Sequence, residues 1–187
     1  MTAARHDVDD LIRGRRTNMF VDRERAVPDE TIAELCELAT WAPNHKRTWP
    51  WRFASVTGAG RSRLGQVVSG AMAAHGDEPH KVTKALTKYE RTPNILIIGS
   101  VIGDSDERSA ENRDAVAAAA QNLMLAATAR GIATYWGSCP KGSHEAVATF
   151  AGFAPDTHIV GIFYVGYPIE SMEVPERPDP VINVIDN

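Results

Sequence analysis

The segment that decides the fold reads Trp41-Ala-Pro-Asn-His-Lys-Arg-Thr-Trp-Pro-Trp-Arg-Phe53, and its composition is unlike that of an ordinary loop. Its thirteen residues include three tryptophans, two prolines, a histidine, a lysine and two arginines. Loops between regular elements normally carry Gly, Ser and Asp, which suit turn geometry. The prolines fix φ and push Ala42 and Trp49 towards extended backbone. Flat aromatic faces beside positive charge suit a planar ligand that bears phosphate, although tryptophans that merely plug a core edge would give the same composition.

Regular elements flank this segment on both sides. Val27-Pro28-Asp29 opens a helix whose apolar residues keep helical spacing up to Ala39, and residues 51–57 have the pattern of a strand. Hydrophobic periodicity predicts the remaining helices at about 7–14, 60–74, 80–90, 107–130 and 142–151. It predicts further strands at 94–102, 132–136 and 158–166. The first and last of these strands are continuous apolar runs, which indicates burial on both faces. The elements are mixed in an α+β manner.

The helix at 107–130 is apolar on nearly every side, so we expect it to be buried either in the core or against a partner subunit. Gly131 stands where a helix-ending glycine belongs. The tail at about 168–187 carries four prolines and cannot form a compact helix. Because no repeat or linker divides the chain, we expect a single domain over 1–187.

Composition excludes several functional classes. Hydrophobic residues make up 43% and charged residues 24% of the 187 residues, and the formal charge is −4, which argues against non-specific binding to nucleic acid. Cys36 and Cys139 share no metal-binding or redox spacing, so neither a disulfide framework nor a structural zinc is expected. The chain begins without an apolar leader and has no run of about eighteen apolar residues. We therefore expect a cytoplasmic protein with no membrane partner.

Most short motifs in the chain fail on inspection. Gly58-Ala-Gly-Arg-Ser-Arg63 lacks the third glycine of a dinucleotide fingerprint, and Gln66-Val67 stands where a phosphate-binding loop needs Lys-Ser/Thr. Gly137-Ser138-Cys139 is not a nucleophile elbow, and His144-Glu145 has no second metal ligand at a useful spacing, so no metal site is expected. Arg15-Arg16-Thr17 could clamp a phosphate through bidentate hydrogen bonds, although such a doublet alone is more often a solvated surface feature.

Taken together, these segments resemble the FMN-dependent nitroreductase family, from Leu11 to about Ile169. Arg15-Arg16-Thr17 is similar to the family's opening Arg-Arg-Ser, which grips the FMN phosphate and ribityl chain. Ala39-Thr-Trp-Ala-Pro43 followed by Pro50-Trp-Arg-Phe53 resembles its Ala-x-x-Ala-Pro … Gln-Pro-Trp-x-Phe block. Asn44-His45-Lys46 resembles the Asp-His-Lys of a compact bacterial subgroup of NAD(P)H nitroreductases, in which the histidine is placed at the flavin.

A later segment, Gly131-Ile-Ala-Thr-Tyr-Trp-Gly-Ser138, is similar to the family's Gly-Leu-Gly-x-x-Trp, which lies by the flavin. The resemblance implies FMN binding by a set of residues from all these motifs: Arg15, Arg16, Thr17, Trp41, Asn44, His45, Lys46, Arg47, Trp49, Trp136, Gly137 and Ser138. It also implies contact with the nicotinamide nucleotide in one further stretch: Ala126, Ala127, Thr128, Ala129, Arg130 and Gly131.

The chain departs from the family pattern in three places. The common third basic residue after Arg-Arg-Ser is missing, and Met19-Phe20 occupies that region. Arg47 stands where the family has an asparagine, and Trp49 stands where it has a glutamine. Those amides usually lie near the flavin ring, so the ring contacts and the substrate pocket are expected to differ. Trp49 either stacks over the ring or closes the pocket.

The implied fold is an α/β/α sandwich with a mixed, mostly antiparallel sheet, which forms an intertwined homodimer with FMN at the interface. NADH or NADPH would reduce the flavin, and a nitroaromatic, a quinone or a related small-molecule acceptor would then take the electrons in a ping-pong cycle. Since the flavin carries the chemistry, no catalytic protein nucleophile is expected. Lys46 and Arg47 are the predicted cations for the reduced ring.

Other functions stay open at this stage. One is a flavin-binding sensor or store whose pocket Trp49 blocks. Another is a divergent family member that performs reductive dehalogenation or flavin breakdown. The residues do not specify the physiological acceptor, the choice between NADH and NADPH, or whether 70–90 forms a lid over the flavin.

Overall fold

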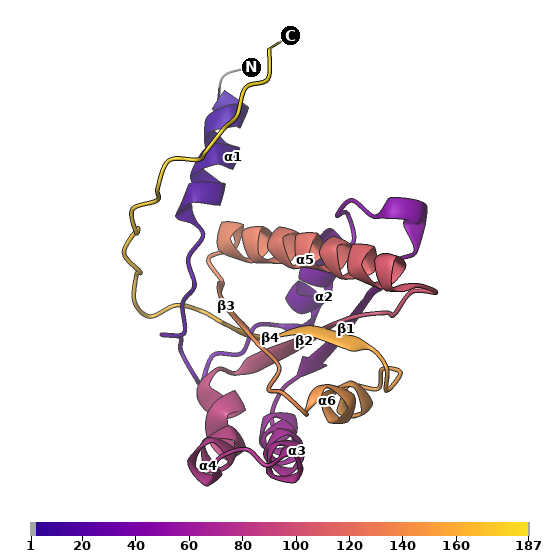
Figure 1. The fold of residues 1–187 in the computed structure, drawn as a ribbon. Helices are drawn as coiled ribbons and strands as arrows, with labels where there is room; N and C mark the ends of the chain where they lie inside the picture. Colours follow the sequence, from indigo (N-terminus) through magenta and orange to yellow (C-terminus); the bar gives the residue numbers. More distant parts are fainter. Residues whose placement is uncertain (1–2, 187) are drawn as a thin grey trace.

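The structure, a computed structural model, describes residues 3–186 and has a four-stranded sheet between two layers of helices (Figure 1). The sheet order is β1-β2-β4-β3, and every neighbouring pair of strands is antiparallel. An isolated parallel bridge between Thr17 and Thr134 adds a short contact at the outer edge of β3. The predicted α+β sandwich is confirmed. The strands are β1 (Trp51–Val56), β2 (Asn94–Ser100), β3 (Ala133–Gly137) and β4 (His158–Gly166).

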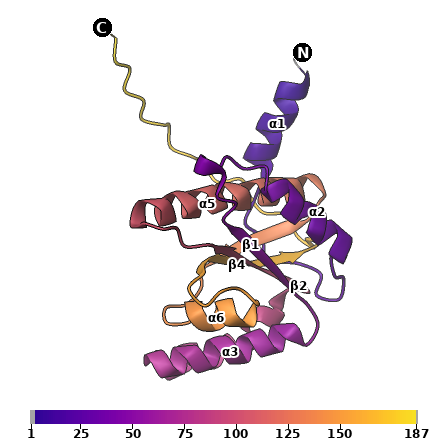
Figure 2. The same cartoon turned by 90° about the vertical axis from the view of Figure 1, so that its right-hand side faces the viewer.

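The helices divide between the two faces of the sheet (Figures 1 and 2). One face carries α2 (Asp29–Ala39) and α5 (Asp106–Ala129). The other face carries α3 (Gly60–His75), α4 (Pro79–Lys88) and α6 (His144–Phe150). Two short 3-10 turns, η1 (His45–Arg47) and η2 (Tyr89–Arg91), precede β1 and β2. Because α3 and α4 lie on the face opposite α5, residues 70–90 do not cover the loop at 41–53 of the same chain.

Alternate residues of β2 enter two separate cores. Leu96 and Ile98 pack against α2 and α5, whereas Ile95 and Ile97 pack against the layer of α3, α4 and α6. This follows from the two-residue period of a strand, which sends successive side chains to opposite faces. Every residue of β2 is buried, as its continuous apolar run predicts.

The long helix α5 has a clear beginning and end. The Ser105 hydroxyl accepts a hydrogen bond from the Arg108 amide at 3.1 Å, which caps the first turn. At the other end Gly131 has φ +68°, and the Ile132 amide donates to the Ala127 carbonyl at 2.9 Å. These are features of a glycine-ended helix, and they confirm the predicted role of Gly131. The inner side of α5 is buried, and much of its outer side is half-buried.

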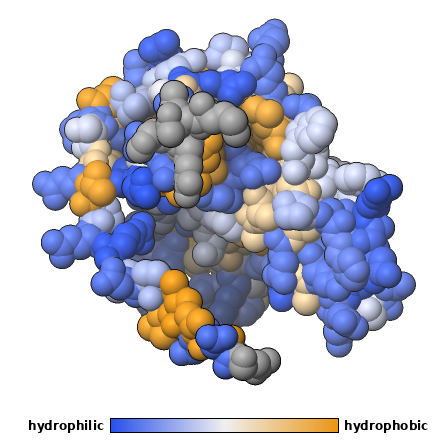
Figure 3. All heavy atoms as spheres, turned by 90° about the horizontal axis from the view of Figure 1, so that it is seen from above, coloured by the Kyte–Doolittle hydropathy of each residue, from blue (hydrophilic) through white to orange (hydrophobic). Residues whose placement is uncertain are grey.

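Two segments project from the body on the same side, α1 (Ala3–Gly14) and the tail beyond Glu170 (Figures 1 and 2). More than half of the surface of Val8 and Ile12 on α1 is exposed. The tail has no regular structure there and leaves its last apolar side chains almost fully exposed: Val181, Ile182, Val184 and Ile185. Seen from above, this side is hollowed and its hydrophobic patches alternate with polar surface (Figure 3). Exposed apolar patches rimmed by polar surface are typical of a surface that a partner covers.

Candidate functional site

Arg15, Arg16 and Thr17 follow α1 and meet the sheet at the beginning of β3. Thr17 forms the bridge to Thr134, and the Asn18 amide donates to the Thr134 carbonyl at 3.1 Å. The basic pair is therefore held beside an edge strand rather than on a free linker. Beyond this bridge, the outer edge of β3 has no strand partner among the described residues.

A cavity of about 290 Å³ opens at the basic pair, and the tail forms its other wall. Burial lowers the pKa of Arg15 below its ordinary value, and the nearby charges of Arg16 and Arg177 lower it further. Arg16 donates to the Arg15 carbonyl at 2.7 Å, but its Nε is buried without a hydrogen-bond partner. Three guanidinium groups and the Thr17 hydroxyl around one cavity have the donor chemistry of a phosphate site. The full lining is Arg15, Arg16, Thr17, Met172, Glu173, Val174, Pro175 and Arg177.

Arg177 bears on one departure from the family pattern, the missing third basic residue. The third basic residue is absent after Arg15-Arg16-Thr17, but the tail brings a cation from the other end of the chain to the same cavity. No local pattern could have revealed this, because the tail has no periodicity that fixes its path.

The far end of β3 carries Trp136 and Gly137, followed by Ser138. The Trp136 indole N–H donates to the Val160 carbonyl at 3.0 Å, and its ring lies 5.0 Å from that of Phe163. The indole rests on the backbone of β4, where a Cβ on Gly161 would come within 2.3 Å of its nitrogen. Ser138 is exposed. Ser138 lies four residues beyond Thr134, which is about 13 Å at about 3.3 Å per residue.

Beside this end of β3 lies a second cavity, of about 350 Å³, which we call the lysine cavity. Burial lowers the pKa of Lys88 below its ordinary value, and the charges of Arg91 and Lys84 lower it further. Sequence reasoning missed this group, although its basic residues recur at helical spacing along α4. The lining residues are Met72, Lys81, Lys84, Ala85, Lys88, Arg91, Tyr135 and Pro140.

The aromatic and basic loop before β1 has an unusual backbone. Lys46, Arg47 and Trp49 have φ values of +61°, +53° and +48°, in the left-handed region that favours glycine. Each such non-glycine residue costs about 1–2 kcal/mol. Strain of this kind persists only where surrounding contacts impose it, and it concentrates at functional sites.

Side-chain hydrogen bonds impose that backbone. The Asn44 carboxamide accepts from the Trp49 amide at 2.9 Å and donates to the Thr48 hydroxyl at 3.1 Å. Thr48 in turn donates to Asn112 on α5 at 2.5 Å. Asn112 is only 3% exposed and donates to the Val101 carbonyl at 3.0 Å. The loop is thus fastened to the first turns of α5.

His45 is held by the same helix. Its Nδ1 lies 2.8 Å from the Glu111 carboxylate, which also pairs with Arg108. The hydrogen bond with His45 is the main reason that the pKa of Glu111 lies below its ordinary value, and the Arg108 charge adds to it. Because Nδ1 faces Glu111, Nε2 is the ring nitrogen left to meet a ligand.

The loop presents its rings and charges outward. Trp41 is 76% exposed, and its indole N–H donates to Glu37 at 2.6 Å. Trp49 is 55% exposed and meets Trp51 edge to face at 5.7 Å. Lys46 and Arg47 are also exposed. Trp41 and Trp49 therefore do not plug the core edge, whereas the half-buried Trp51 packs against the core, as the alternative interpretation of this segment expects.

The loop and the β3 groups lie on opposite edges of the sheet. The loop leads into β1, which is one edge strand, whereas β3 is the other. The loop is fastened near the beginning of α5, and β3 follows the end of that helix (Figure 1). With 24 residues, α5 is about 36 Å long at about 1.5 Å per residue. One chain therefore does not bring His45 to Arg16 or to Ser138.

The stretch predicted to contact the nicotinamide nucleotide, 126–131, forms the end of α5 and the turn into β3. It therefore lies on the side of Arg15 and Arg16. Ala127 is fully buried, while Arg130 is exposed and lies 3.4 Å from Glu34.

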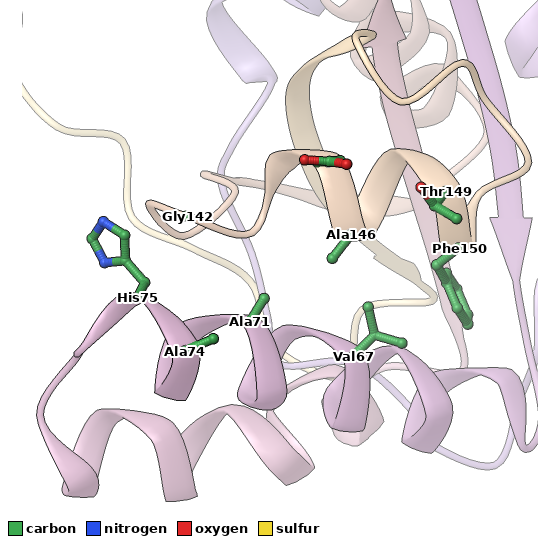
Figure 4. Close-up of a pocket in the computed structure, with 9 residues that line it drawn as sticks. Val67, Ala71, Ala74, His75, Gly142, Ala146, Thr149 and Phe150 are labelled. Atoms are coloured by element: carbon green, nitrogen blue, oxygen red, sulfur yellow. The ribbon is translucent and has the colours of Figure 1, made fainter.

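A groove of about 680 Å³ runs between α3 and α6, and none of the predicted site residues lines it. Val67, Ala71 and His75 on α3 face Ala146 and Phe150 on α6 across this groove (Figure 4). Within residues 3–186, no three side chains of the metal-ligating types cluster together. No helix in that range is both long and apolar enough to cross a bilayer.

Comparison with known proteins identifies the family of this chain. The nitroreductase family model matches residues 12–167, which is most of the chain. The chain belongs to the nitroreductase family. The protein named "Putative NAD(P)H nitroreductase YfhC" from Bacillus subtilis is 30% identical to it over 175 residues, covering 90% of this chain and 88% of that protein. The family resemblance seen in the sequence is confirmed.

Solved structures share the nitroreductase fold. The nitroreductase-like family protein from Bacillus cereus superposes with a TM-score of 0.83 at 24% identity and covers 96% of each chain. The FMN-dependent nitroreductase NfnB from Mycobacterium smegmatis, in complex with NADPH, gives a TM-score of 0.73 at 21% identity. That match covers 94% of this chain and 96% of NfnB.

Proposed function

We propose that this nitroreductase-family protein is an FMN-dependent oxidoreductase that uses NADH or NADPH to reduce a nitroaromatic, a quinone or a related acceptor. The observation that carries the proposal is the pair of cationic cavities at the two ends of the exposed edge of β3. FMN fits this arrangement, with its phosphate in the cavity at Arg15 and Arg16 and its ring beside the lysine cavity. The relative NfnB, which is FMN-dependent and was solved with NADPH, supports the same cofactor and reductant.

The residues present fit that cofactor. Arg15, Arg16 and Arg177 would hold the phosphate, because their crowded charges and the orphaned Nε of Arg16 call for an anion. Thr17 would donate its hydroxyl to the phosphate or ribityl oxygens, and Trp136, Gly137 and Ser138 would lie by the ring. Bound FMN would supply the chemistry, accepting a hydride from the nucleotide and passing electrons to the acceptor in a ping-pong cycle.

Lys88 would stabilise the negative charge that the ring gains on reduction. It is partly buried in the lysine cavity, next to the end of β3. A unit charge about 4 Å away at an effective dielectric near 20 contributes about 4 kcal/mol before desolvation. Lys46 and Arg47, which the sequence suggested for this role, lie at the opposite edge of the same chain and would act only from a second copy.

We propose that this second copy is present, as a homodimer with sites between protomers. The loop that carries His45 and Trp49 would reach the β3 edge of the partner, because it does not reach its own. The exposed apolar residues of α1 and of the tail support such an assembly. His45 would then offer Nε2, and Trp49 its exposed ring, to the partner's flavin.

The absorbance spectrum of the purified protein tests the proposal. Bands of oxidised flavin that bleach when NADH or NADPH is added without oxygen are the expected result. Arg16→Ala should lose FMN, whereas Arg13→Ala, on the exposed face of α1 and paired with Asp9, should keep it. A colourless protein that does not bind added FMN would rule the proposed function out. Flavin that binds but never bleaches would favour a sensor or store.

A further inference from the structure

We propose that the substrate slot of this protein selects planar electron acceptors that carry negative charge, such as nitroaromatic carboxylates. The inference rests on the proposed function, and it names the substrate class of the same site. It is drawn from the lysine cavity, whose charge exceeds what binding a flavin ring requires.

The lining of the lysine cavity is cationic and uncompensated. It includes four cations and no carboxylate. Only Lys81 has an acidic partner, Glu78 at 3.4 Å. Lys84, Lys88 and Arg91 take part in none of the ion pairs formed within the described part of the chain. Their charges repel one another: the pKa of Lys88 is lowered mainly by burial, and the charges of Arg91 and Lys84 lower it further. An anion is the ligand that relieves this repulsion.

The four cations of the lysine cavity lie in a row along α4 and η2 rather than around one position. Lys81, Lys84 and Lys88 recur at three- and four-residue spacing on α4, which places them on one side of the helix, and Arg91 continues the row in η2. Lys88 is the most buried of the four, and Lys84 and Lys81 are exposed further along the helix. With Lys88 near the flavin, Lys84 and Lys81 are left on the outer part of the row for an acceptor.

The rest of the lining is apolar and suits a flat ring. Met72, Ala85, Tyr135 and Pro140 supply the walls between the cations. The lysine cavity has a volume of about 350 Å³ and would border the flavin ring at Lys88, so the space left for an acceptor suits a single substituted ring rather than an extended molecule. A ligand with an apolar ring and one anionic group would contact both the apolar walls and the row of cations.

The reaction places no further demand on the protein. A nitroaromatic takes a hydride from NAD(P)H by way of the flavin and a proton from solvent, and it leaves as a nitroso compound and water: Ar–NO₂ + NAD(P)H + H⁺ → Ar–NO + NAD(P)⁺ + H₂O. The carboxylate does not react. It would contact Lys84 and Lys81 and so hold the ring in the cavity during electron transfer.

Kinetics of the FMN-loaded protein with two matched acceptors tests the inference. The two are 4-nitrobenzoate and its neutral methyl ester, each assayed at saturating NADH or NADPH. The measured quantity is the ratio of kcat/KM for the acid to kcat/KM for the ester. Lys84→Gln should lower this ratio by about five- to tenfold, and Arg23→Gln, which changes an exposed arginine in another part of the surface, should leave it unchanged. Added salt should also lower the ratio in the wild type.

Other results would separate a failure of this inference from a failure of the proposed function. A ratio that neither Lys84→Gln nor salt alters would overturn the inference while the proposed function stands. If Lys84→Gln instead raises KM for the nucleotide and leaves the ratio alone, the row of lysines serves the reductant and the inference is wrong. If the flavin-loaded wild type reduces neither compound and no quinone, the proposed function fails and takes the inference with it.

Discussion

At the scale of single residues, the candidate site depends on side chains that hold other side chains in place. His45 is fixed by Glu111, and the strained backbone from Lys46 to Trp49 is fixed by Asn44 and Asn112. Fixed geometry in the free protein reduces the ordering that a ligand must impose on binding. We therefore expect the supporting residues to affect FMN affinity nearly as strongly as those that touch it.

Glu111 gives the first test of this expectation. Glu111→Leu should weaken FMN binding several-fold and free the ring of His45, because Nδ1 loses its acceptor. Glu111→Gln keeps an amide oxygen at that position and should retain most of the affinity. Titration with FMN measures the affinity, and the ¹⁵N shifts of the imidazole report which nitrogen carries the proton.

Arg108→Met is the matched control, since it removes the other partner of Glu111 and leaves the contact with His45 intact. It should keep both the affinity and the histidine shifts of the wild type. An unchanged imidazole spectrum in Glu111→Leu would show that Glu111 does not position His45.

Sequence motifs point to those residues of the candidate site that lie in contiguous segments, such as Arg15-Arg16-Thr17 and the loop at 44–49, and their contact with FMN stays a prediction. They missed Lys88, Arg177 and Glu111, which reach the same places from distant parts of the chain. Contacts of that kind depend on how the elements pack, and local spacing does not contain that information. Met19-Phe20 follows the basic pair without a third cation, and Arg177 of the tail lines the same cavity instead.

At the scale of helices and strands, the sequence predicted nearly everything. Every expected element is present, because apolar periodicity marks most of them and long apolar runs mark the buried helix at 107–130 and the strands at 94–102 and 158–166. The sequence did not predict how closely neighbouring helices pack against each other. Gly65 on α3 is the clearest case, since a Cβ added there would lie 2.1 Å from the Leu86 carbonyl oxygen on α4.

Gly65→Ala should therefore destabilise the fold by about 1–3 kcal/mol, since α3 and α4 must separate to admit the methyl group. Gly70, on the same helix, has nothing within 4 Å of an added Cβ. Gly70→Ala should be neutral or stabilise by about 0.5–1 kcal/mol through better helix propensity. Urea unfolding of both variants measures the difference. Equal stabilities would mean that the two helices are not in backbone contact.

Two histidines between α6 and β4 lead us to expect a loss of stability in acid. His144 and His158 stack at 5.3 Å. Burial lowers the pKa of both, and the nearby charges of His144 and Arg113 also lower that of His158. The unfolded chain then binds protons more readily than the folded one, so stability is full above the ordinary value of 6.5 and falls as the pH drops below it.

Replacing both histidines with glutamine should flatten this fall, and His80→Gln, at an exposed helix start, should alter it little. Chemical unfolding between about pH 7.5 and 5 gives the slope. A double variant whose stability falls as steeply as that of the wild type would assign the acid sensitivity to other groups.

At the scale of the whole molecule, the two halves of the proposed site lie at opposite edges of one sheet. The order of the motifs along the chain does not reveal this separation, although the family resemblance implies FMN at a dimer interface. The separation becomes visible only when the strand order β1-β2-β4-β3 is known. A site assembled from Arg16 of one protomer and His45 of another follows if the homodimer exists.

Heterodimers of two variants test whether each FMN site uses residues from both protomers. Arg16→Ala and His45→Ala homodimers should both lose FMN, since every site in each carries one defect. A heterodimer of the two has one site with both defects and one site with none. Random reassortment after co-refolding should therefore restore about a quarter of the wild-type FMN sites, measured as bound flavin. If both halves of a site came from the same chain, every site would stay defective and no flavin would return.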